Sequence, residues 1–426
     1  MALTVRGGGA APVQITLALK IVMLSGALLA GLALVAVNAV LPAIDKALAH
    51  TPGDSLLVKQ MLGAAGLAMV LGAPLGGFLA DRFGLRVPLI GAALLYTAAG
   101  TAGLYLDSLP LLVASRFATG FAGGAFQVIS ITVINSRLAG EQRAKWMGLH
   151  ISAAMLGTLA MHPIAGALGN LGWRWPFALY GVGLLMIPVG LMQATDGPSF
   201  RTRGHAAQAA QPVASLLRTF PYHYLPLALA IGTVVFVPTV YMPFILRNMG
   251  FGTPLVISLV LTVDSAAGVI MSLLYGKART FLSIHGVFLV SFSLSALGIA
   301  VALATAQPWI FIGGIMIYGF GVGWLVANLI NALADKVAPS RQGRAAGFVK
   351  AAHFASAPIG IMIVEPIVRR HGPTIALAIA GGLSVCLLVL IALRRWLSAP
   401  VAVGAGRRAR STSRSEAAIG VGAEVQ

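Results

Sequence analysis

Long apolar runs separated by short polar stretches dominate the chain. Each run holds roughly 20 mainly apolar residues, which is the length that an α-helix needs to cross the hydrocarbon core of a bilayer. The runs lie near residues 16–40, 58–80, 87–105, 110–135, 146–168, 174–194, 223–246, 253–275, 283–304, 308–331, 346–367 and 374–394. The pattern therefore predicts an all-α integral membrane protein with twelve transmembrane helices.

One connection is much longer than the others and is polar, and it divides the runs six and six. This stretch, 195–222, predicts a cytoplasmic central loop between two six-helix bundles, which cover 16–194 and 223–394. We expect a short cytoplasmic segment over 1–15. The basic, small-residue-rich tail over 395–426 has the composition of a disordered segment.

Two stretches of the chain resemble each other weakly at an offset of 199 residues. They read "LAGEQRAKWMG" (138–148) and "VAPSRQGRAAG" (337–347), and each precedes the fifth run of its half. The matching positions are Ala139 and Ala338, Lys145 and Arg344, and Gly148 and Gly347. Membrane proteins built from two repeated halves show weak symmetry of this kind, so we expect the two bundles to be pseudo-symmetric.

The composition strengthens the membrane assignment. Hydrophobic residues make up 58% of the chain and charged residues only 9%, against roughly 25% charged residues in soluble domains. The net charge of +18 does not indicate nucleic-acid binding, because no basic stripe is interleaved with aromatic residues. Cys386 is the single cysteine, which excludes an intrachain disulfide and a cysteine cluster for a metal.

The basic residues instead set the orientation in the membrane. If both termini face the cytoplasm, most Lys and Arg residues fall in cytoplasmic loops, as the positive-inside rule requires. The outside then carries Lys46, Lys59, Arg174, Arg247, Arg369 and Arg370. We expect a multi-pass protein of a cell membrane, of the bacterial inner-membrane type, in contact with the lipid bilayer.

The loop between the second and third runs reads "GGFLADRFGLR" and holds an acid and two arginines in a chain with little charge. Its distinctive residues are Gly77, Asp81, Arg82, Gly84 and Arg86. This stretch resembles the signature loop of the major facilitator superfamily, which has the pattern G-x-L-A-D-R-x-G-x-R. The alternative interpretation is a cytoplasmic basic loop with one incidental acid.

The resemblance implies a part for each of these residues in an inner gate. Gly77 would pack helix two against helix eleven, and Asp81 would lie near the N-terminus of helix eleven, where the helix dipole favours an anion. Arg82 and Arg86 would pair with acids or with helix C-termini. The cluster would hold the inner gate shut while the outer side is open.

The fourth run contains "RFATGFAGGA", which resembles an R-x-x-x-G motif of the same superfamily. Arg116, Gly120 and Gly124 fall on one helical face. An arginine within a membrane span is costly and normally faces a cavity or an acid, which makes Arg116 a candidate pathway residue. The alternative is an arginine near the outer interface whose charged end reaches toward the headgroups.

The fifth run resembles the antiporter motif of the drug-exporting branches of this superfamily, which ends in G-P-x-x-G. The matching residues are Gly157, Pro163, Gly166 and Gly169, with His162 in place of the glycine before the proline. Small residues and a proline predict a kinked helix with a smooth face, which suits tight packing across the two halves.

Three ionisable residues inside the runs are candidates for coupling transport to protons. Asp264 lies midway along the eighth run, where a carboxylic acid could load and release a proton, or could be a structural acid bonded to Ser265. Glu365 lies near the outer end of the eleventh run and could belong to the pathway or to the interface. His162 could relay a proton or could be a packing residue.

Together these residues predict a secondary transporter that works by alternating access and exchanges protons for a small hydrophobic or drug-like molecule. An importer or facilitator of a small organic anion on the same fold, using Arg116, stays open. A membrane receptor or scaffold is disfavoured, because twelve spans leave little apparatus for signalling. We expect no enzyme activity, no cofactor and no metal, since no nucleophile–base motif, metal-ligand spacing or phosphate loop is found. The expected partners are a small-molecule substrate and protons, and we expect a monomer.

Overall fold

The computed structural model describes residues 16–192, 220–304, 307–338 and 341–397. Within these ranges it is all-helical, and it has eleven helices long and apolar enough to cross a membrane together with a shorter apolar helix, Trp175–Leu191. The predicted fold class is therefore confirmed. The N-terminal segment, nearly all of the central loop and nearly all of the tail lie outside the described residues.

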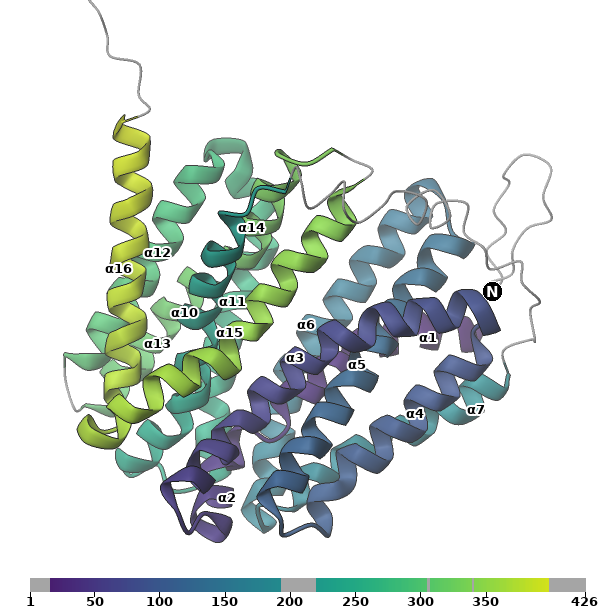
Figure 1. Cartoon of the computed structure of the whole chain (residues 1–426), viewed down its shortest axis with the longest axis horizontal. Helices are drawn as coiled ribbons and strands as arrows, with labels where there is room; N and C mark the ends of the chain where they lie inside the picture. Colours follow the sequence, from purple (N-terminus) through teal and green to yellow (C-terminus); the bar gives the residue numbers. More distant parts are fainter. Residues whose placement is uncertain (1–15, 193–219, 305–306, 339–340, 398–426) are drawn as a thin grey trace, which may run out of the picture.

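The first six predicted runs form ten helical elements (Figure 1). They are α1 (Leu17–Val35), η1 (Asn38–Val40), α2 (Leu41–Leu48), α3 (Pro52–Phe83), α4 (Arg86–Gly100), η2 (Thr101–Leu104), α5 (Leu109–Arg137), α6 (Gly140–Leu171), η3 (Trp175–Leu185) and α7 (Met186–Leu191). The first run continues through η1 into α2, and the sixth run is the shorter helix, which begins as a 3₁₀-helix.

The last six predicted runs form a second set of helices. They are α10 (Tyr224–Asn248), α11 (Pro254–Phe281), α12 (Ile284–Leu303), α13 (Pro308–Val322), α14 (Leu325–Ala334), α15 (Gln342–His371) and α16 (Thr374–Leu397). The tenth run is interrupted between α13 and α14, at Gly323 and Trp324. The two stretches that resemble each other in sequence open α6 and α15, the equivalent helices of the two sets.

Local sequence signals fix where the functionally important helices begin and end. At the start of α3 the Thr51 side chain accepts a hydrogen bond from the backbone N–H of Asp54. The Asp54 side chain accepts one from the backbone N–H of Thr51, and the two bonds form a capping box. Gly84 ends α3 with a φ of 73° and Gly372 ends α15 with a φ of 84°. Glycine adopts such angles without the steric cost that a side chain imposes.

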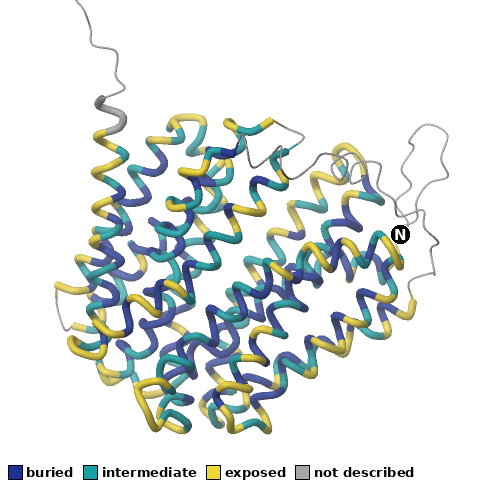
Figure 2. The backbone as a smooth tube through the Cα atoms, in the orientation of Figure 1, coloured by how far each residue is buried: buried dark blue, intermediate teal, exposed yellow. Residues whose placement is uncertain are grey.

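Each set of helices has its own hydrophobic core, and a third cluster lies between them. One core draws almost entirely on α1–α7, and the second draws almost entirely on α10–α16. The third cluster joins Leu62 of α3 to residues of α10 and α15. We refer to the two sets as the first and second halves. In Figure 1 the halves approach each other near α2, and in Figure 2 buried residues run through each of them.

Glycines allow close helix packing inside the first half. A methyl group at Gly72 or Gly76 of α3 would collide with the backbone of α5, and one at Gly120 or Gly124 of α5 would collide with the backbone of α3. Helices in a membrane associate through such small residues, because lipid supplies no hydrophobic force between them. The glycines near Arg116 are therefore packing residues.

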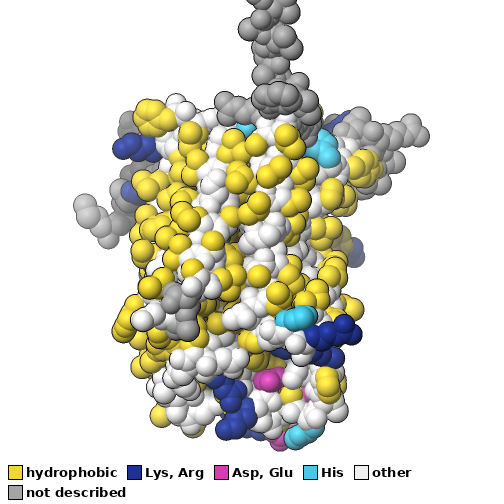
Figure 3. Space-filling view, turned by 90° about the vertical axis from the view of Figure 1, so that its left-hand side faces the viewer, with side chains coloured by type: hydrophobic (Ala, Val, Ile, Leu, Met, Phe, Trp, Pro, Cys, Tyr) yellow, Lys and Arg dark blue, Asp and Glu magenta, His cyan; other side chains and the backbone are white. Residues whose placement is uncertain are grey.

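Large hydrophobic side chains cover the outside of the bundle. Among them are Phe281, Trp309, Leu273 and Leu156, all more than half exposed. In the side view of Figure 3, hydrophobic residues fill the broad middle of the surface, and most of the charged residues in view lie toward its ends. This distribution is that of a multi-pass protein that contacts lipid around its circumference.

The packing of α3 on α5 makes a testable prediction. Replacing Gly124 with Ala should lower the free energy of unfolding by about 1–3 kcal/mol, because the methyl group would overlap backbone atoms of Met69. Thermal unfolding of the purified protein in detergent measures the effect. Gly91→Ala is the matched control, since nothing lies within 4 Å of the added methyl group. Equal melting temperatures for the two variants would contradict this account of the packing.

Candidate functional site

The most extensive packing between the halves is in two helix pairs: α3 packs against α15, and α6 packs against α11. The end of the bundle at which α2 lies also holds the start of α3 at Pro52 and the end of α15 at His371. We call it the α2 end, and it is at the bottom of Figure 1. The opposite end holds the turn at Gly84 between α3 and α4, and we call it the motif end.

Small residues of α6 bring it against α11 near the α2 end. A methyl group at Gly166 would collide with the side chain of Ser258, and one at Gly169 would collide with Pro254. The smooth face predicted for the fifth run therefore packs against the other half at these two glycines. Gly157 instead faces Leu28 of α1, within its own half.

The end of α6 also bonds to the start of α11. The side-chain Oδ1 of Asn170 accepts a hydrogen bond from the backbone N–H of Leu255, with 3.1 Å between the two atoms. The first N–H groups of a helix have no partner within the helix, so this contact supplies one from the other half. Pro163 lies inside α6, where its ring removes a backbone hydrogen bond.

His162 and Ser265 form a polar contact between the halves, deeper in the bundle. His162 is 4% exposed, and its Nε2 lies 3.2 Å from Oγ of Ser265 in α11. Ser265 is eleven residues beyond the start of α11 at Pro254, which is about 16 Å along the helix at 1.5 Å per residue. The pair therefore lies at mid-depth, where a relay or substrate-binding residue is expected.

Asp264 immediately precedes Ser265 and turns its carboxylate toward α13. A methyl group at Gly319 of α13 would lie 2.8 Å from Oδ1 of Asp264. That oxygen is buried, and it has no hydrogen-bond partner among the described residues. The pairing of α6 with α11 thus brings His162 to Ser265, the neighbour of Asp264 in the sequence, while the Oδ1 of Asp264 itself faces α13.

Aromatic rings occupy the meeting of the halves near α15. Phe236 of α10 lies 5.1 Å from the His353 ring and 5.6 Å from the Phe354 ring, measured between centroids. A methyl group at Gly66 of α3 would lie 2.9 Å from Cδ1 of Phe354, so this ring packs directly on the first half. The interface between the halves is therefore aromatic here.

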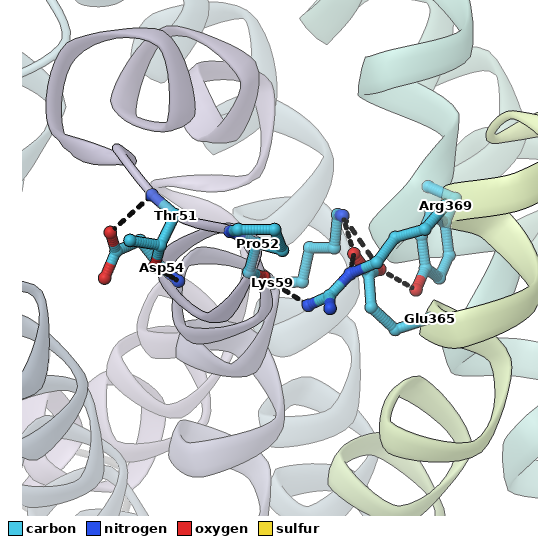
Figure 4. Close-up of polar contacts among 7 residues, drawn as sticks. Thr51, Pro52, Asp54, Lys59, Glu365 and Arg369 are labelled. Carbon is cyan, nitrogen blue, oxygen red and sulfur yellow. Dashed lines mark hydrogen bonds and ion pairs between the residues drawn. The ribbon is translucent and has the colours of Figure 1, made fainter.

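The contact of α3 with α15 at the α2 end is charged and buried. Nζ of Lys59 donates to both carboxylate oxygens of Glu365, at 2.7 and 2.8 Å (Figure 4). The hydroxyl of Tyr241 donates to Oε2 of Glu365 at 2.7 Å, and Nε of Arg369 donates to Oε1 at 3.3 Å. Lys59 is 7% exposed and Glu365 is 2% exposed. We call Lys59, Tyr241, Glu365 and Arg369 the Glu365 cluster.

The structure places Lys59 in α3 and not in the loop before it. Because the capping box at Thr51 starts α3 early, Lys59 lies two turns inside the helix. The sequence does show a lysine at the edge of an apolar run. Its partner could not be read from the sequence, because Lys59 and Glu365 are 306 residues apart.

Arg116 is fully buried, and its described contacts lie in the first half. Its Nη2 donates to the carbonyl of Gly100 at 2.7 Å and to that of Ala99 at 3.1 Å, at the end of α4. The guanidinium lies 4.5 Å from the Tyr180 ring centroid and 4.8 Å from the Phe177 ring centroid. A cation at a helix C-terminus is stabilising. The Nε and Nη1 atoms of Arg116 are buried without a hydrogen-bond partner among the described residues, and a pathway role for Arg116 stays a prediction.

Among the described residues, no hydrogen bond or ion pair joins the signature loop to α15. A methyl group at Gly77 would lie 3.2 Å from Val128 of α5, so the close neighbour of this glycine is α5 and not helix eleven. Within the described ranges, Oδ1 of Asp81 is buried without a hydrogen-bond partner. Arg82 is exposed, and Arg86 is the first residue of α4.

The other polar bonds between the halves also lie toward the α2 end. Arg247 donates to the Pro42 carbonyl at 2.6 Å, and Gln60 donates to the Pro358 carbonyl at 3.0 Å. Arg369 donates to the carbonyl of Pro52. In the described part of the chain the halves are therefore bonded at the α2 end and at mid-depth.

Comparison with known proteins agrees with this architecture. The chain is 28% identical over 176 residues to the chloramphenicol resistance protein of Streptomyces lividans, covering 41% of this chain and 44% of that protein. It is 27% identical over 239 residues to the 3-(3-hydroxy-phenyl)propionate transporter of Escherichia coli, covering 53% of this chain and 54% of that protein. The chain thus matches about half the length of these relatives.

A solved structure extends the likeness to the fold. The crystal structure of a D-xylose-proton symporter superposes with a TM-score of 0.72 at 16% identity, over 88% of this chain and 96% of that one. The sequence pattern of the Major Facilitator Superfamily matches residues 23–282 and 250–420. This chain belongs to the Major Facilitator Superfamily.

Proposed function

We propose that this transporter exports a small hydrophobic, cationic or neutral drug-like molecule in exchange for protons. The observation that carries the proposal is the buried Oδ1 of Asp264, which has no hydrogen-bond partner among the described residues and belongs to the neighbour of Ser265, whose Oγ contacts His162 of the other half. A buried acid without a counter-cation can hold either a proton or a cationic ligand, since either one balances its charge. That competition is the basis of exchange.

The remaining membrane acid is less suited to this part. Among the described residues, Glu365 already bonds to two cations and a tyrosine hydroxyl, whereas Oδ1 of Asp264 is unbonded. The aromatic group formed by Phe236, His353 and Phe354 supplies apolar surface at the other helix pair that joins the halves, α3 with α15. A hydrophobic molecule with a positive or polar group fits this combination.

Alternating access follows from the two-half architecture. We take the α2 end as the outer side and the motif end as the cytoplasmic side, with both termini in the cytoplasm of a bacterial cell, in line with the distribution of basic residues. The hydrogen bonds and ion pairs that join the halves at the α2 end would then close the outer side. When the outer side opens, the signature loop with Asp81 would approach the start of α15, as the family resemblance implies.

A second candidate is import of a small organic anion. The similarity to the 3-(3-hydroxy-phenyl)propionate transporter supports it, because that protein is named for an organic acid. Arg116 argues against import. The import hypothesis needs this arginine as the cation that binds the anion, but Arg116 is buried and hydrogen-bonded within the first half. We retain the expectation of a monomer with no enzyme activity and no cofactor.

The exchange proposal predicts a specific effect of removing the carboxylate. In inside-out vesicles the wild type should release protons from the lumen when a cationic dye or drug is added. Asp264→Asn should abolish this release, because the amide cannot carry a proton between the two sides. Fluorescence of a trapped pH indicator measures it, with Asp335→Asn as the control, since Asp335 is exposed in the loop after α14.

The contrary result distinguishes the two candidates. If organic anions move, cationic drugs release no protons and Asp264→Asn behaves as the wild type, the exporter proposal is wrong and the importer remains. The same vesicles, tested with both compound classes, give this answer directly.

The contact of α6 with α11 makes a second prediction. Gly166→Leu should reduce transport by about 5- to 150-fold, because overpacking of about 1–3 kcal/mol would oppose closure of the α2 end. Gly148→Leu on the same helix is the control, since nothing lies within 4 Å of that position. Uptake of the dye into inside-out vesicles measures transport. Equal activity in the two variants would show that closure does not need this contact.

A further inference from the structure

We propose that Lys59 and Glu365 form the charge latch that holds the outer gate shut, and that their bond breaks once in every transport cycle. The inference goes beyond the substrate and the coupling ion, and it rests on the proposed function only in taking the α2 end as the outer side. No motif in the sequence marks these two residues. Their role follows from where the fold places them.

The geometry of the pair is that of a latch between two moving bodies. Lys59 belongs to the first half and Glu365 to the second, and Nζ bonds to both carboxylate oxygens. Figure 4 shows the lysine reaching across from α3 to α15. Nζ also lies 5.4 Å from the Tyr241 ring centroid and 5.3 Å from that of Phe244, both in α10. Every group that holds the ammonium therefore comes from the other half.

An apolar seal lies directly beneath the latch. Leu62 is three residues further along α3 and is 4% exposed. It belongs to a buried cluster with Val237 and Val240 of α10 and with Ile361 and Val364 of α15. Because this cluster also spans the halves, the α2 end cannot open without wetting it and separating Lys59 from Glu365. Latch and seal thus open together.

Lys59 and Glu365 differ in the partners that each would keep when the halves separate. Glu365 keeps Tyr241 and Arg369 when the halves separate, because all three belong to the second half. In the described part of the chain, the anion that pairs with Lys59 is Glu365. The nearest acid on its own helix, Asp54, is bonded to backbone N–H groups of Thr51 and His50. Loss of Glu365 therefore leaves a buried ammonium without a counter-charge, whereas loss of Lys59 leaves a carboxylate that is still paired.

The same two helices extend to the opposite gate. Asp81 lies on α3 22 residues beyond Lys59, about 33 Å along the helix at 1.5 Å per residue, and α15 begins at Gln342 near that end. Rocking of rigid halves about the middle would separate these helices at one end as it brings them together at the other. The Lys59–Glu365 bond is in this way the outer counterpart of the contact that the signature loop is expected to make.

Cysteine labelling tests the latch without knowledge of the substrate. Leu62→Cys is placed in a Cys386→Ser background, and intact cells are treated with a membrane-impermeant maleimide. Labelling should be slow when the latch is intact. Adding Glu365→Gln should raise the rate by about tenfold or more, because removing one member of a buried pair leaves the other charge unpaired. Lys59→Met should raise it less.

Two further variants separate a latch from a general loss of structure. Combining Lys59→Met with Glu365→Met should label more slowly than Glu365→Gln, because apolar residues of similar size can replace a buried ion pair without loss of closure. Arg370→Gln should leave the rate unchanged, since Arg370 is an exposed neighbour of the cluster. If Glu365→Gln fails to fold, the comparison of Lys59→Met with the double variant still tests the proposal.

Equal labelling of Leu62→Cys with and without Lys59→Met and Glu365→Gln, in folded protein, would overturn the latch. A second cysteine tests the orientation on its own. His50→Cys, in the exposed turn before α3, should label from outside in every variant. If it labels only in inside-out vesicles, the proposed topology is wrong, and repeating the Leu62→Cys series in those vesicles tests the latch at the α2 end.

Discussion

The hydrocarbon core of a bilayer offers no hydrogen bonds, and this constraint organises the whole molecule. Backbone groups must be satisfied within each spanning segment, which leaves helices as the local structure. Charged side chains must find partners inside the protein. Arg116 does so at the carbonyls that end α4, and Lys59 does so at Glu365 in the opposite half. The two solutions differ in reach, because only the second joins the two halves.

The embedded charges differ in the partners they have, and the proposed roles follow from that difference. Arg116 bonds to backbone carbonyls of its own half, so its interactions can persist throughout a transport cycle. Glu365 bonds to both halves, which makes it sensitive to gate closure. In the described part of the chain, Oδ1 of Asp264 bonds to neither. That difference is the physical reason for assigning exchange to Asp264 and gating to Glu365.

Small residues decide where the halves can approach. Gly166 and Gly169 let α6 meet α11, and Gly63 and Gly66 let α3 meet α15. A methyl group at Gly63 would lie 2.9 Å from the backbone nitrogen of Pro358, which shows how closely the second pair is packed. Polar contacts such as Asn170 with Leu255 then fix the register of this packing. Burial of apolar area alone would not fix the register, because helices in lipid gain little free energy by exchanging lipid for protein.

The sequence by itself determined the helical membrane class, the twelve apolar runs and the family resemblance, because the length of an apolar run and the spacing of a local motif are read along one segment. It also marked Asp264, His162 and Glu365 as unusual, since an ionisable group stands out in an apolar run. Tertiary structure alone decided what each of them contacts. It put Arg116 inside one half, turned Gly77 toward α5, and joined Lys59 to Glu365. Helices that are apolar all round do not reveal which face meets a partner, so contacts between residues 306 positions apart exist only once the bundle has packed.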